Sequence, residues 1–325
     1  MTTTEITAAY FINETRDSND FFVGPFSIPA EPAASHVRVE VHAAALNPAD
    51  WKRACGAVGQ MSREEHPGHI GLDVAGVVTK IGSNVTQFKP GDKVYGLLNH
   101  NNAVGSVATH VDAAEHDLAL KPQQLSFAEA AAIPLAGLTA LQALKKAGLG
   151  EGKNVFINAG AGGVGSFALQ LARLYFKANK IATTVSTSKV ALAKKLGATE
   201  IVDYTKEDFT KVLSAEYEAA LDSVGDIENI AKIVKRNPDS PSRIISIVEI
   251  PDRETYCEGV ETTFNVTIPG SENLERVFNK LVDEGKLQVL IDSTHEFTQD
   301  GVRRAIARLL EGRATGKIVI TVKGD

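Results

Sequence analysis

The chain has 325 residues, of which 43% are hydrophobic and 23% are charged, and its formal net charge is −6. The length allows two domains, and the acidic balance argues against a nucleic-acid-binding surface. The N-terminus lacks the regions of a signal peptide, and no stretch approaches the ~18 apolar residues of a membrane span. Cys55 and Cys257 form no CxxC pair, which suits a soluble protein of the reducing cytoplasm.

The first part of the chain, to about residue 125, predicts mostly strands and turns. Residues 37–43, VRVEVHA, alternate apolar and polar side chains as a half-buried strand does. Residues 74–81 form a second strand, and the turn signal at 89–92 precedes a third that starts at Lys93. Ser126 and Glu129 have the spacing of a capping box, which predicts an alanine-rich helix through Ala132. A further helix is expected over 138–146, ending at Gly148.

Residues 154–177, NVFINAGAGGVGSFALQLARLYFK, contain the most informative motif. A short apolar strand, a GxGxxG turn and an amphipathic helical pattern follow one another, as in a dinucleotide-binding βαβ unit. Gly160 allows a tight turn, Gly162 lets the backbone approach a pyrophosphate, and Gly165 lets the helix pack close to the strand. The helix dipole then favours phosphate at its amino end. The expected phosphate-binding residues are Gly160, Gly162, Gly163, Val164 and Gly165.

After residue 154, predicted strands and helices alternate, which indicates a parallel sheet with crossover helices. The C-terminal part predicts two more helices and a last strand. The expected strands are 155–157, 180–186, 200–202, 217–221, 243–248 and 317–322, and the expected helices are 189–196, which Gly197 ends, 274–284 and 302–311.

The end of the second strand of this alternating region bears on which dinucleotide binds. NAD-binding units place Asp or Glu there to accept hydrogen bonds from the ribose 2′-hydroxyl. This chain has TVSTSK at 184–189, with no carboxylate. Hydroxyls and a lysine suit a 2′-phosphate, which a carboxylate would repel. We therefore expect NADPH rather than NADH, with Ser186 and Lys189 as phosphate contacts; the alternative for Lys189 is a solvated residue in a helix's first turn.

Several further motifs follow one another along nearly the whole chain. They are ALNPADWK at 45–52, GLDVAGVV at 71–78, KPGDKV at 89–94, IPLAGLTA at 133–140, KLGA at 195–198, LDSVG at 221–225 and GKIVI at 316–320. Together with the glycine loop they resemble a zinc-independent member of the medium-chain dehydrogenase/reductase superfamily, in its quinone oxidoreductase and enone (alkenal) reductase branch. The resemblance implies an α/β fold with two domains. These are a GroES-like β-rich catalytic domain, 1–127 with 286–325, and a Rossmann domain with a doubly wound parallel sheet, 128–285.

The resemblance also bears on zinc. Zinc-dependent relatives have a Cys at the position of Asn47 and a His-Glu pair at the positions of Leu72 and Asp73, and they carry a lobe of four closely spaced cysteines. A catalytic zinc takes about three protein ligands of Cys, His or carboxylate type. The eight histidines show no HxxxH or HxH pattern. We therefore expect no metal site.

Without a metal, substrates that need little carbonyl activation are favoured. Quinones and α,β-unsaturated carbonyls fit, because hydride addition to a conjugated acceptor gives a delocalised anion. The candidate catalytic residues are Lys52, Asn47 and Asp50, at the place where zinc relatives hold metal ligands. Lys52 is either an oxyanion stabiliser or a surface residue paired with Asp50, and the enone branch often has lysine there. Asn47 and Asp50 would order the loop and contact the cofactor.

The resemblance implies further cofactor contacts. Thr139 would approach the nicotinamide or its phosphates, and Tyr204 would flank the 2′-phosphate. Ser223 and Val224 would lie beside the ribose, and Ile247 would lie where backbone groups meet the carboxamide. The alternative for Thr139, Ser223 and Ile247 is packing within the helix or strand.

Family members are often dimers that pair through an edge strand of the Rossmann sheet, so a homodimer is expected. The leading function is NADPH-dependent reduction of a small-molecule quinone or enone. Two alternatives stay open: an enoyl-thioester reductase, and a non-catalytic NADPH-binding structural or regulatory protein.

Overall fold

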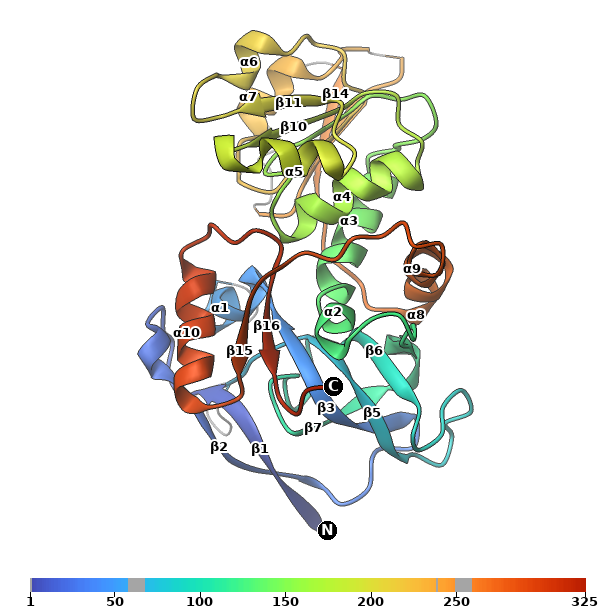
Figure 1. The fold of residues 1–325 in the computed structure, drawn as a ribbon, viewed down its shortest axis with the longest axis vertical. Coiled ribbons are helices and arrows are strands. Elements are labelled where there is room, and N and C mark those ends of the chain that lie inside the picture. Colours follow the sequence, from blue (N-terminus) through green and yellow to red (C-terminus); the bar gives the residue numbers. More distant parts are fainter. Residues whose placement is uncertain (1, 58–67, 238, 249–258) are drawn as a thin grey trace. The chain divides into compact units, whose positions relative to one another are not determined.

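The computed structural model describes residues 2–57, 68–237, 239–248 and 259–325, so that Cys257 lies outside the described residues. The chain divides into two compact units (Figure 1). Unit 1 comprises Met1–Leu135 and Pro269–Asp325, and unit 2 comprises Ala136–Ile268. The segment from Pro269 onward is tied into unit 1 by the pairing of β16 (Lys317–Thr321) with β3 (His36–Leu46) and by a hydrogen bond of 2.7 Å from the Tyr95 hydroxyl to Asn279 Oδ1. The domain limits of 127/128 and 285/286 stay a prediction, since a compact unit and a folding domain are different properties.

Unit 1 is built on two sheets. Its strands are β1 (Thr3–Phe11), β2 (Phe21–Pro29), β3 (His36–Leu46), β4 (Gly68–His69), β5 (Asp73–Ile81), β6 (Lys93–Leu97), β7 (His110–Ala114), β8 (Leu118–Leu120), β15 (Ile291–Glu296) and β16 (Lys317–Thr321). The larger sheet has the order β15-β16-β3-β5-β6-β8, with β7 also paired to β3, and the smaller has the order β2-β1-β4. The strands expected near 37–43, 74–81, 93 and 317–322 are thus confirmed.

Strand β3 is the centre of the larger sheet. Val37, Val39 and Val41 are fully buried in one hydrophobic cluster, as the alternation of the sequence predicts. The strand runs on to Leu46, where its alanines pair with β5 on one side and β16 on the other. The last four residues of β3 therefore hold the C-terminal strand against the segment that begins at Asn47.

The helical segments of unit 1 lie around these sheets. They are η1 (Ser18–Asp20), α1 (Pro48–Ala54), η2 (Glu115–Asp117), α2 (Phe127–Ala131), α8 (Ser271–Asn273), the π-helical turn η5 (Leu274–Asn279), α9 (Lys280–Asp283) and α10 (Gln299–Leu310). The expected capping box of α2 is confirmed, because Ser126 Oγ accepts from Glu129 N at 3.2 Å and Glu129 Oε2 accepts from Ser126 N at 2.9 Å. The helix α3 (Pro134–Lys146) begins earlier than expected, at a proline suited to a first turn.

Unit 2 contains a six-stranded sheet. Its strands are β9 (Val155–Ile157), β10 (Ile181–Val185), β11 (Glu200–Asp203), β12 (Ala219–Asp222), β13 (Ser242–Ser246) and β14 (Val260–Phe264). Their order is β11-β10-β9-β12-β13-β14, and every neighbouring pair is parallel. The expected parallel sheet is confirmed. The chain reverses its direction of travel across the sheet between β9 and β12, which is where such folds bind ligands.

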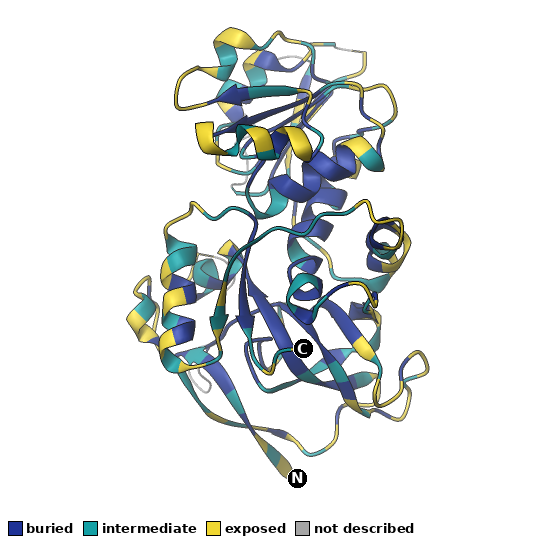
Figure 2. Ribbon diagram, in the orientation of Figure 1, coloured by how far each residue is buried: buried dark blue, intermediate teal, exposed yellow. Residues whose placement is uncertain are grey.

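Helices cover both faces of this sheet. They are α4 (Gly163–Leu174), η3 (Thr187–Lys189), α5 (Val190–Lys195), α6 (Phe209–Val212) and α7 (Ile227–Ile233). Figure 1 shows α4 and α5 on one face, with α6 and α7 on the other, as right-handed crossovers require. Residues 165–172 of α4 are all buried, and Figure 2 shows them dark against the exposed outer side of α5.

Candidate functional site

The loops that follow five parallel strands of unit 2 carry most of the expected cofactor residues. Gly160 follows β9, Ser186 follows β10, Tyr204 follows β11, Ser223 follows β12 and Ile247 follows β13. Because the strands are parallel, their carboxyl ends lie at one edge of the sheet. The structure thus brings these residues together at a single edge.

The three glycines of the loop differ in how tightly they are packed. A Cβ on Gly160 would lie 2.2 Å from Thr183 Oγ1, and one on Gly165 would lie 2.3 Å from Ala159 O. A Cβ on Gly162 would lie 3.3 Å from Ala159 O, a tight contact that a shift of a few tenths of an ångström would relieve. Ala159 itself has φ +50°, which turns the chain sharply out of β9.

The amino end of α4 suits a phosphate. Gly162 is its N-cap and provides no side-chain cap, and Gly163 and Val164 form its first half-buried turn. The first N–H groups of a helix have no partner within the helix, and the dipole makes this end positive. The residues present therefore fit the pyrophosphate of a dinucleotide.

The expected 2′-phosphate residues lie at the ends of β10 and β11. Ser186 is half-buried and is the N-cap of η3, whose last residue, Lys189, donates its N–H to Ser186 O at 2.9 Å. Tyr204 is 61% exposed, and its N–H donates to Val185 O at 3.1 Å. Ser186, Lys189 and Tyr204 are thus held near one another by backbone bonds.

A buried polar network ties the ends of β9, β12 and β13 together, and the sequence did not reveal it. Asp222 is fully buried; its Oδ1 accepts from Asn158 Nδ2 at 2.8 Å and from Gly225 N at 3.0 Å. Its Oδ2 accepts from Ser246 Oγ at 2.9 Å. Ser223 donates its N–H to Asn158 Oδ1 at 2.7 Å. The sequence pattern that could indicate this network is a polar residue directly after each of two apolar runs, Asn158 after VFI and Asp222 after AAL.

The remaining expected contacts of unit 2 differ in exposure. Val224 is 56% exposed, and Ile247 is half-buried with its N–H donating to Asp222 O at 3.0 Å. Thr139 is 5% exposed on α3, where its hydroxyl forms a hydrogen bond with that of Thr267. This hydrogen bond fixes the Thr139 hydroxyl within unit 2.

The candidate catalytic residues lie on and before α1 of unit 1. Asn47 is the N-cap, and its N–H donates to Asp50 Oδ2 at 2.8 Å. Asp50 Oδ1 accepts from Gly71 N, also at 2.8 Å. Burial raises the pKa of the Asp50 carboxyl to about 6, against the opposing effect of these two backbone bonds. Lys52 is half-buried in the same helix. The Asp50 carboxylate thus links the amino end of α1 to Gly71.

Asn47 also belongs to a buried cluster with two residues whose role the sequence did not indicate. Lys317 Nζ donates to Leu46 O at 2.9 Å and to Asn47 Oδ1, and it lies 3.1 Å from Asp73 Oδ2. Asn47 Nδ2 donates to Asp73 Oδ2 at 2.8 Å. Asp73 Oδ1 accepts from Leu135 N at 2.6 Å, at the start of α3. The cluster therefore links β3, β5, β16 and α3.

The residues of this cluster do not fit a zinc ion. The positions that hold zinc ligands in zinc-dependent relatives carry an amide at Asn47, a leucine at Leu72 and a carboxylate at Asp73 that already has the ammonium of Lys317 beside it. Across the described ranges of the chain, no group of three or more His, Cys, Asp or Glu residues is arranged to hold a metal. Similarly, none of the helices in those ranges is long and apolar enough to cross a membrane.

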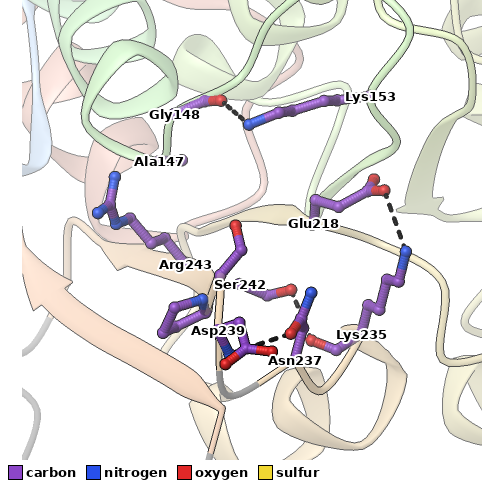
Figure 3. Close-up of a pocket in the computed structure, with 11 residues that line it drawn as sticks. Ala147, Gly148, Lys153, Glu218, Lys235, Asn237, Asp239, Ser242 and Arg243 are labelled. Carbon is purple, nitrogen blue, oxygen red and sulfur yellow. Dashed lines mark hydrogen bonds and ion pairs between the residues drawn. The ribbon is translucent and has the colours of Figure 1, made fainter.

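A cavity of about 460 Å³ lies at the opposite, amino-end edge of the unit 2 sheet (Figure 3). Its cations are bonded within the protein. Lys153 Nζ donates to Gly148 O at 2.8 Å, Lys235 Nζ lies 3.9 Å from a Glu218 oxygen, and Arg243 pairs with Glu261. We therefore assign this cavity no part in binding the dinucleotide.

Two family models match the chain. Residues 33–134 match the alcohol dehydrogenase GroES-like domain, and residues 196–320 match the family described as zinc-binding dehydrogenase. The first match lies within unit 1, and the second covers much of unit 2 and continues into the C-terminal part of unit 1. The expected fold, a GroES-like β-rich domain with a Rossmann-like parallel-sheet domain, is confirmed.

Individual proteins narrow the family further. The chain is 41% identical to a 2-methylene-furan-3-one reductase of Solanum lycopersicum, over 87% of this chain and 71% of that protein. It is 34% identical, with the same coverage, to an NADPH-dependent alkenal/one oxidoreductase, chloroplastic, of Arabidopsis thaliana. The solved structure of the quinone oxidoreductase from Coxiella burnetii covers 98% of this chain and 100% of its own, with 30% identity and a TM-score of 0.88. The chain therefore belongs to the medium-chain dehydrogenase/reductase superfamily, in its quinone oxidoreductase and alkenal/one reductase branch.

Proposed function

We propose that this protein uses NADPH to reduce the carbon–carbon double bond of small conjugated enones and alkenals. The observation that carries the proposal is the 41% identity to a relative named for the reduction of 2-methylene-furan-3-one, a conjugated enone. A second relative is named for alkenals and alkenones and for NADPH. The chain is thus an NAD(P)H-dependent oxidoreductase of its family. That its substrate is an enone and its cofactor is NADPH rather than NADH is what we propose.

The amino end of α4 would hold the cofactor's pyrophosphate. Gly162, Gly163 and Val164 offer backbone N–H groups and the positive end of the helix dipole. Thr139, Ser223, Val224 and Ile247 are the proposed contacts toward the nicotinamide end. A reduced nicotinamide, when bound, supplies the hydride. The protein's own part is to bind, to orient and to stabilise developing charge.

Ser186, Lys189 and Tyr204 would select the 2′-phosphate. Hydroxyl and ammonium donors bind phosphate oxygens, and no carboxylate occurs within residues 184–189. The name of the Arabidopsis relative supports NADPH. We propose NADPH over NADH on these grounds.

Lys52 would stabilise the enolate oxygen that develops when a conjugated carbonyl is reduced. A preorganised cation at such an oxygen is worth most where water is excluded, and Lys52 is half-buried in α1. Asn47 and Asp50 would hold α1 in place through the bonds from Asn47 N and Gly71 N to the Asp50 carboxylate. Asn47 is also a proposed cofactor contact.

Quinone reduction is the second candidate, favoured by the 30% identity and full-length match to a quinone oxidoreductase. A direct assay separates the candidates. NADPH oxidation would be followed with an alkenone, a quinone and a crotonyl thioester at matched concentrations. We expect the highest kcat/KM with the alkenone. A highest value with the quinone would favour the second candidate, and one with the thioester would favour an enoyl-thioester reductase. NADPH binding without turnover would favour a non-catalytic protein.

We also propose a homodimer and a reducing compartment. The strand β14 is the last in the order of the unit 2 sheet, and pairing of two such strands would join two sheets across a symmetric interface. Light scattering after size exclusion tests the dimer, and a monomer mass would contradict it. The cytoplasm stays our prediction for the compartment; the relative from Arabidopsis is chloroplastic by name, and cell fractionation distinguishes the two.

A further inference from the structure

Asp203 is a buried carboxylate beside the proposed 2′-phosphate residues. It is the last residue of β11, directly before Tyr204, and it is 8% exposed. β11 pairs with β10 such that Asp203 stands opposite Val185, the residue before Ser186. A carboxylate from the neighbouring strand therefore reaches the region where the second strand itself has none.

Both oxygens of Asp203 are engaged. Oδ1 accepts from Thr205 Oγ1 at 2.6 Å and from Thr205 N at 3.1 Å. Oδ2 accepts from the Thr187 hydroxyl and lies 3.2 Å from Lys206 Nζ. The two threonine hydroxyls lie 3.1 Å apart. The carboxylate thus bridges two segments, Thr187–Lys189 after β10 and Tyr204–Lys206 after β11.

These contacts decide what Asp203 can do. A carboxylate offers about four acceptor positions, and here four donors use them, so the group has little capacity left for a ribose hydroxyl. The hydrogen bonds from Thr187 and Thr205 hold the pKa of the Asp203 carboxyl well below its usual range, so the carboxylate is ionised. The ammonium of Lys206 offsets its negative charge. Asp203 therefore does not serve as the acidic residue that binds the ribose 2′-hydroxyl in NAD-binding units. Its negative charge is also compensated, so it does not repel a 2′-phosphate nearby.

We propose that Asp203 is a positioning residue for cofactor selectivity: by bridging the two segments it holds Ser186, Lys189 and Tyr204 in the arrangement that binds a 2′-phosphate. Fixing groups before a ligand arrives lowers the entropy cost of binding. The effect is confined to the 2′-phosphate, because NADH presents a hydroxyl there. The inference rests on the proposed use of NADPH.

The chain offers a matched control in Asp208. Asp208 Oδ1 accepts from Thr210 N at 2.9 Å and from Thr210 Oγ1 at 2.8 Å, the same pair of bonds that Asp203 makes to Thr205. A lysine, Lys211, lies 3.7 Å from its Oδ2. These contacts of Asp208 stay within one short segment at the start of α6, whereas those of Asp203 reach across to η3.

The experiment measures the dissociation constants of NADPH and NADH by fluorescence titration for the wild type, Asp203→Ala, Asp203→Asn and Asp208→Ala. We expect Asp203→Ala to raise the NADPH constant about tenfold, equivalent to about 1.4 kcal/mol, and to change the NADH constant less than about twofold. Asp203→Asn retains one acceptor oxygen and should lie between. Asp208→Ala should leave the ratio of the two constants at the wild-type value.

Equal weakening of both cofactors by Asp203→Ala would reduce the residue to a structural role and overturn the inference. An unchanged ratio would do the same. A wild type that binds NADH more tightly than NADPH would instead overturn the proposed cofactor, and the inference with it.

A second comparison applies if Asp203→Ala does not fold. Thr187→Val removes the bridging hydroxyl and little else. Its loss of NADPH affinity should overlap with that of Asp203→Asn in the double variant, because both substitutions break the same bridge. Additive losses would contradict the bridge.

Discussion

Lys317 Nζ lies 3.1 Å from Asp73 Oδ2, and the two side chains are 3% and 0% exposed. The pair joins the C-terminal strand β16 to β5 across the intervening strand β3. The ammonium also donates to Leu46 O, and the carboxylate also accepts from Asn47 and Leu135. Each charge is therefore compensated by its partner and by further hydrogen bonds, which burial of a charge requires.

Lys317→Met should destabilise the protein strongly. The substitution keeps an apolar stem of similar length but leaves the Asp73 carboxylate buried without its counter-charge, at a cost of about 3–5 kcal/mol. Denaturant unfolding measures the change. The control is Lys80→Met, which breaks the exposed pair with Glu31 and should cost less than about 1 kcal/mol. If both variants lost the same free energy of unfolding, the buried pair would stabilise the protein no more than the exposed pair does.

The raised pKa of Asp50 makes the stability of the protein depend on pH. Its pKa is raised by burial to about 6, from an ordinary value of 3.8. Between these two values the folded state binds a proton that the unfolded state has released. The contribution of Asp50 to the free energy of unfolding therefore falls as pH rises through this window, by up to about 3 kcal/mol, and is constant above it.

Asp50→Asn removes this titration. The free energy of unfolding of the variant, minus that of the wild type, should therefore rise by up to about 3 kcal/mol between about pH 4 and pH 7. Urea unfolding of both proteins at the two pH values measures it. A relative stability that is the same at both values would mean that the carboxyl does not titrate in this window.

Alanine substitutions in the glycine loop distinguish the role of each glycine in packing from its role in cofactor binding. Ala at Gly160 or Gly165 would place a Cβ within 2.3 Å of another atom, and should cost about 1–3 kcal/mol of stability. Ala at Gly162 meets nothing closer than 3.3 Å, with φ −77° that any residue adopts. Because Gly162 is the N-cap of α4, where alanine is less favourable than glycine, Gly162→Ala should cost up to about 1 kcal/mol of stability, and it should raise the NADPH dissociation constant about tenfold.

The control for this series is Gly150→Ala, whose Cβ would have no neighbour within 4 Å. It should change neither stability nor binding. If Gly162→Ala bound NADPH as tightly as the wild type, the pyrophosphate would lie elsewhere.

Lys52→Ala should lower kcat for an alkenone about 100-fold and change KM little, because the ammonium is proposed to act on charge that develops during the reaction. Lys52→Arg keeps the positive charge and should recover part of the rate. Steady-state kinetics at saturating NADPH measures both variants. An unchanged kcat in Lys52→Ala would assign this residue to the surface role that its sequence position equally allows.

The sequence predicts best what depends on local pattern. In unit 2, β9 is a short apolar run and β10 is rich in β-branched residues. Gly165 and Gly197 mark where a helix packs or ends, so the parallel sheet could be predicted from the sequence. The β1–β2 hairpin could not, because Gly24, Pro25 and Pro29 interrupt the strand pattern although the two strands pair along their whole length.

Contacts between distant residues are what the sequence does not reveal. Lys317 and Asp73 are 244 positions apart, and nothing in the local pattern of GKIVI distinguishes a buried lysine from an exposed one. The bridge from Asp203 to Thr187 likewise depends on the register of β10 and β11. The shared edge of the residues that follow the strands of unit 2 could be predicted, because the carboxyl ends of parallel strands lie together.

Transfer of deuterium to an alkenone from NADPH that carries deuterium at both C4 positions tests the central claim most directly. Conjugate reduction forms a bond between the transferred hydride and the β-carbon, after which the α-carbon takes a proton from water or a side chain. We predict a saturated ketone that carries the deuterium at the β-carbon, identified by mass spectrometry and NMR. Deuterium at the carbonyl carbon of an allylic alcohol, or no transfer to the alkenone at all, would contradict the proposed function.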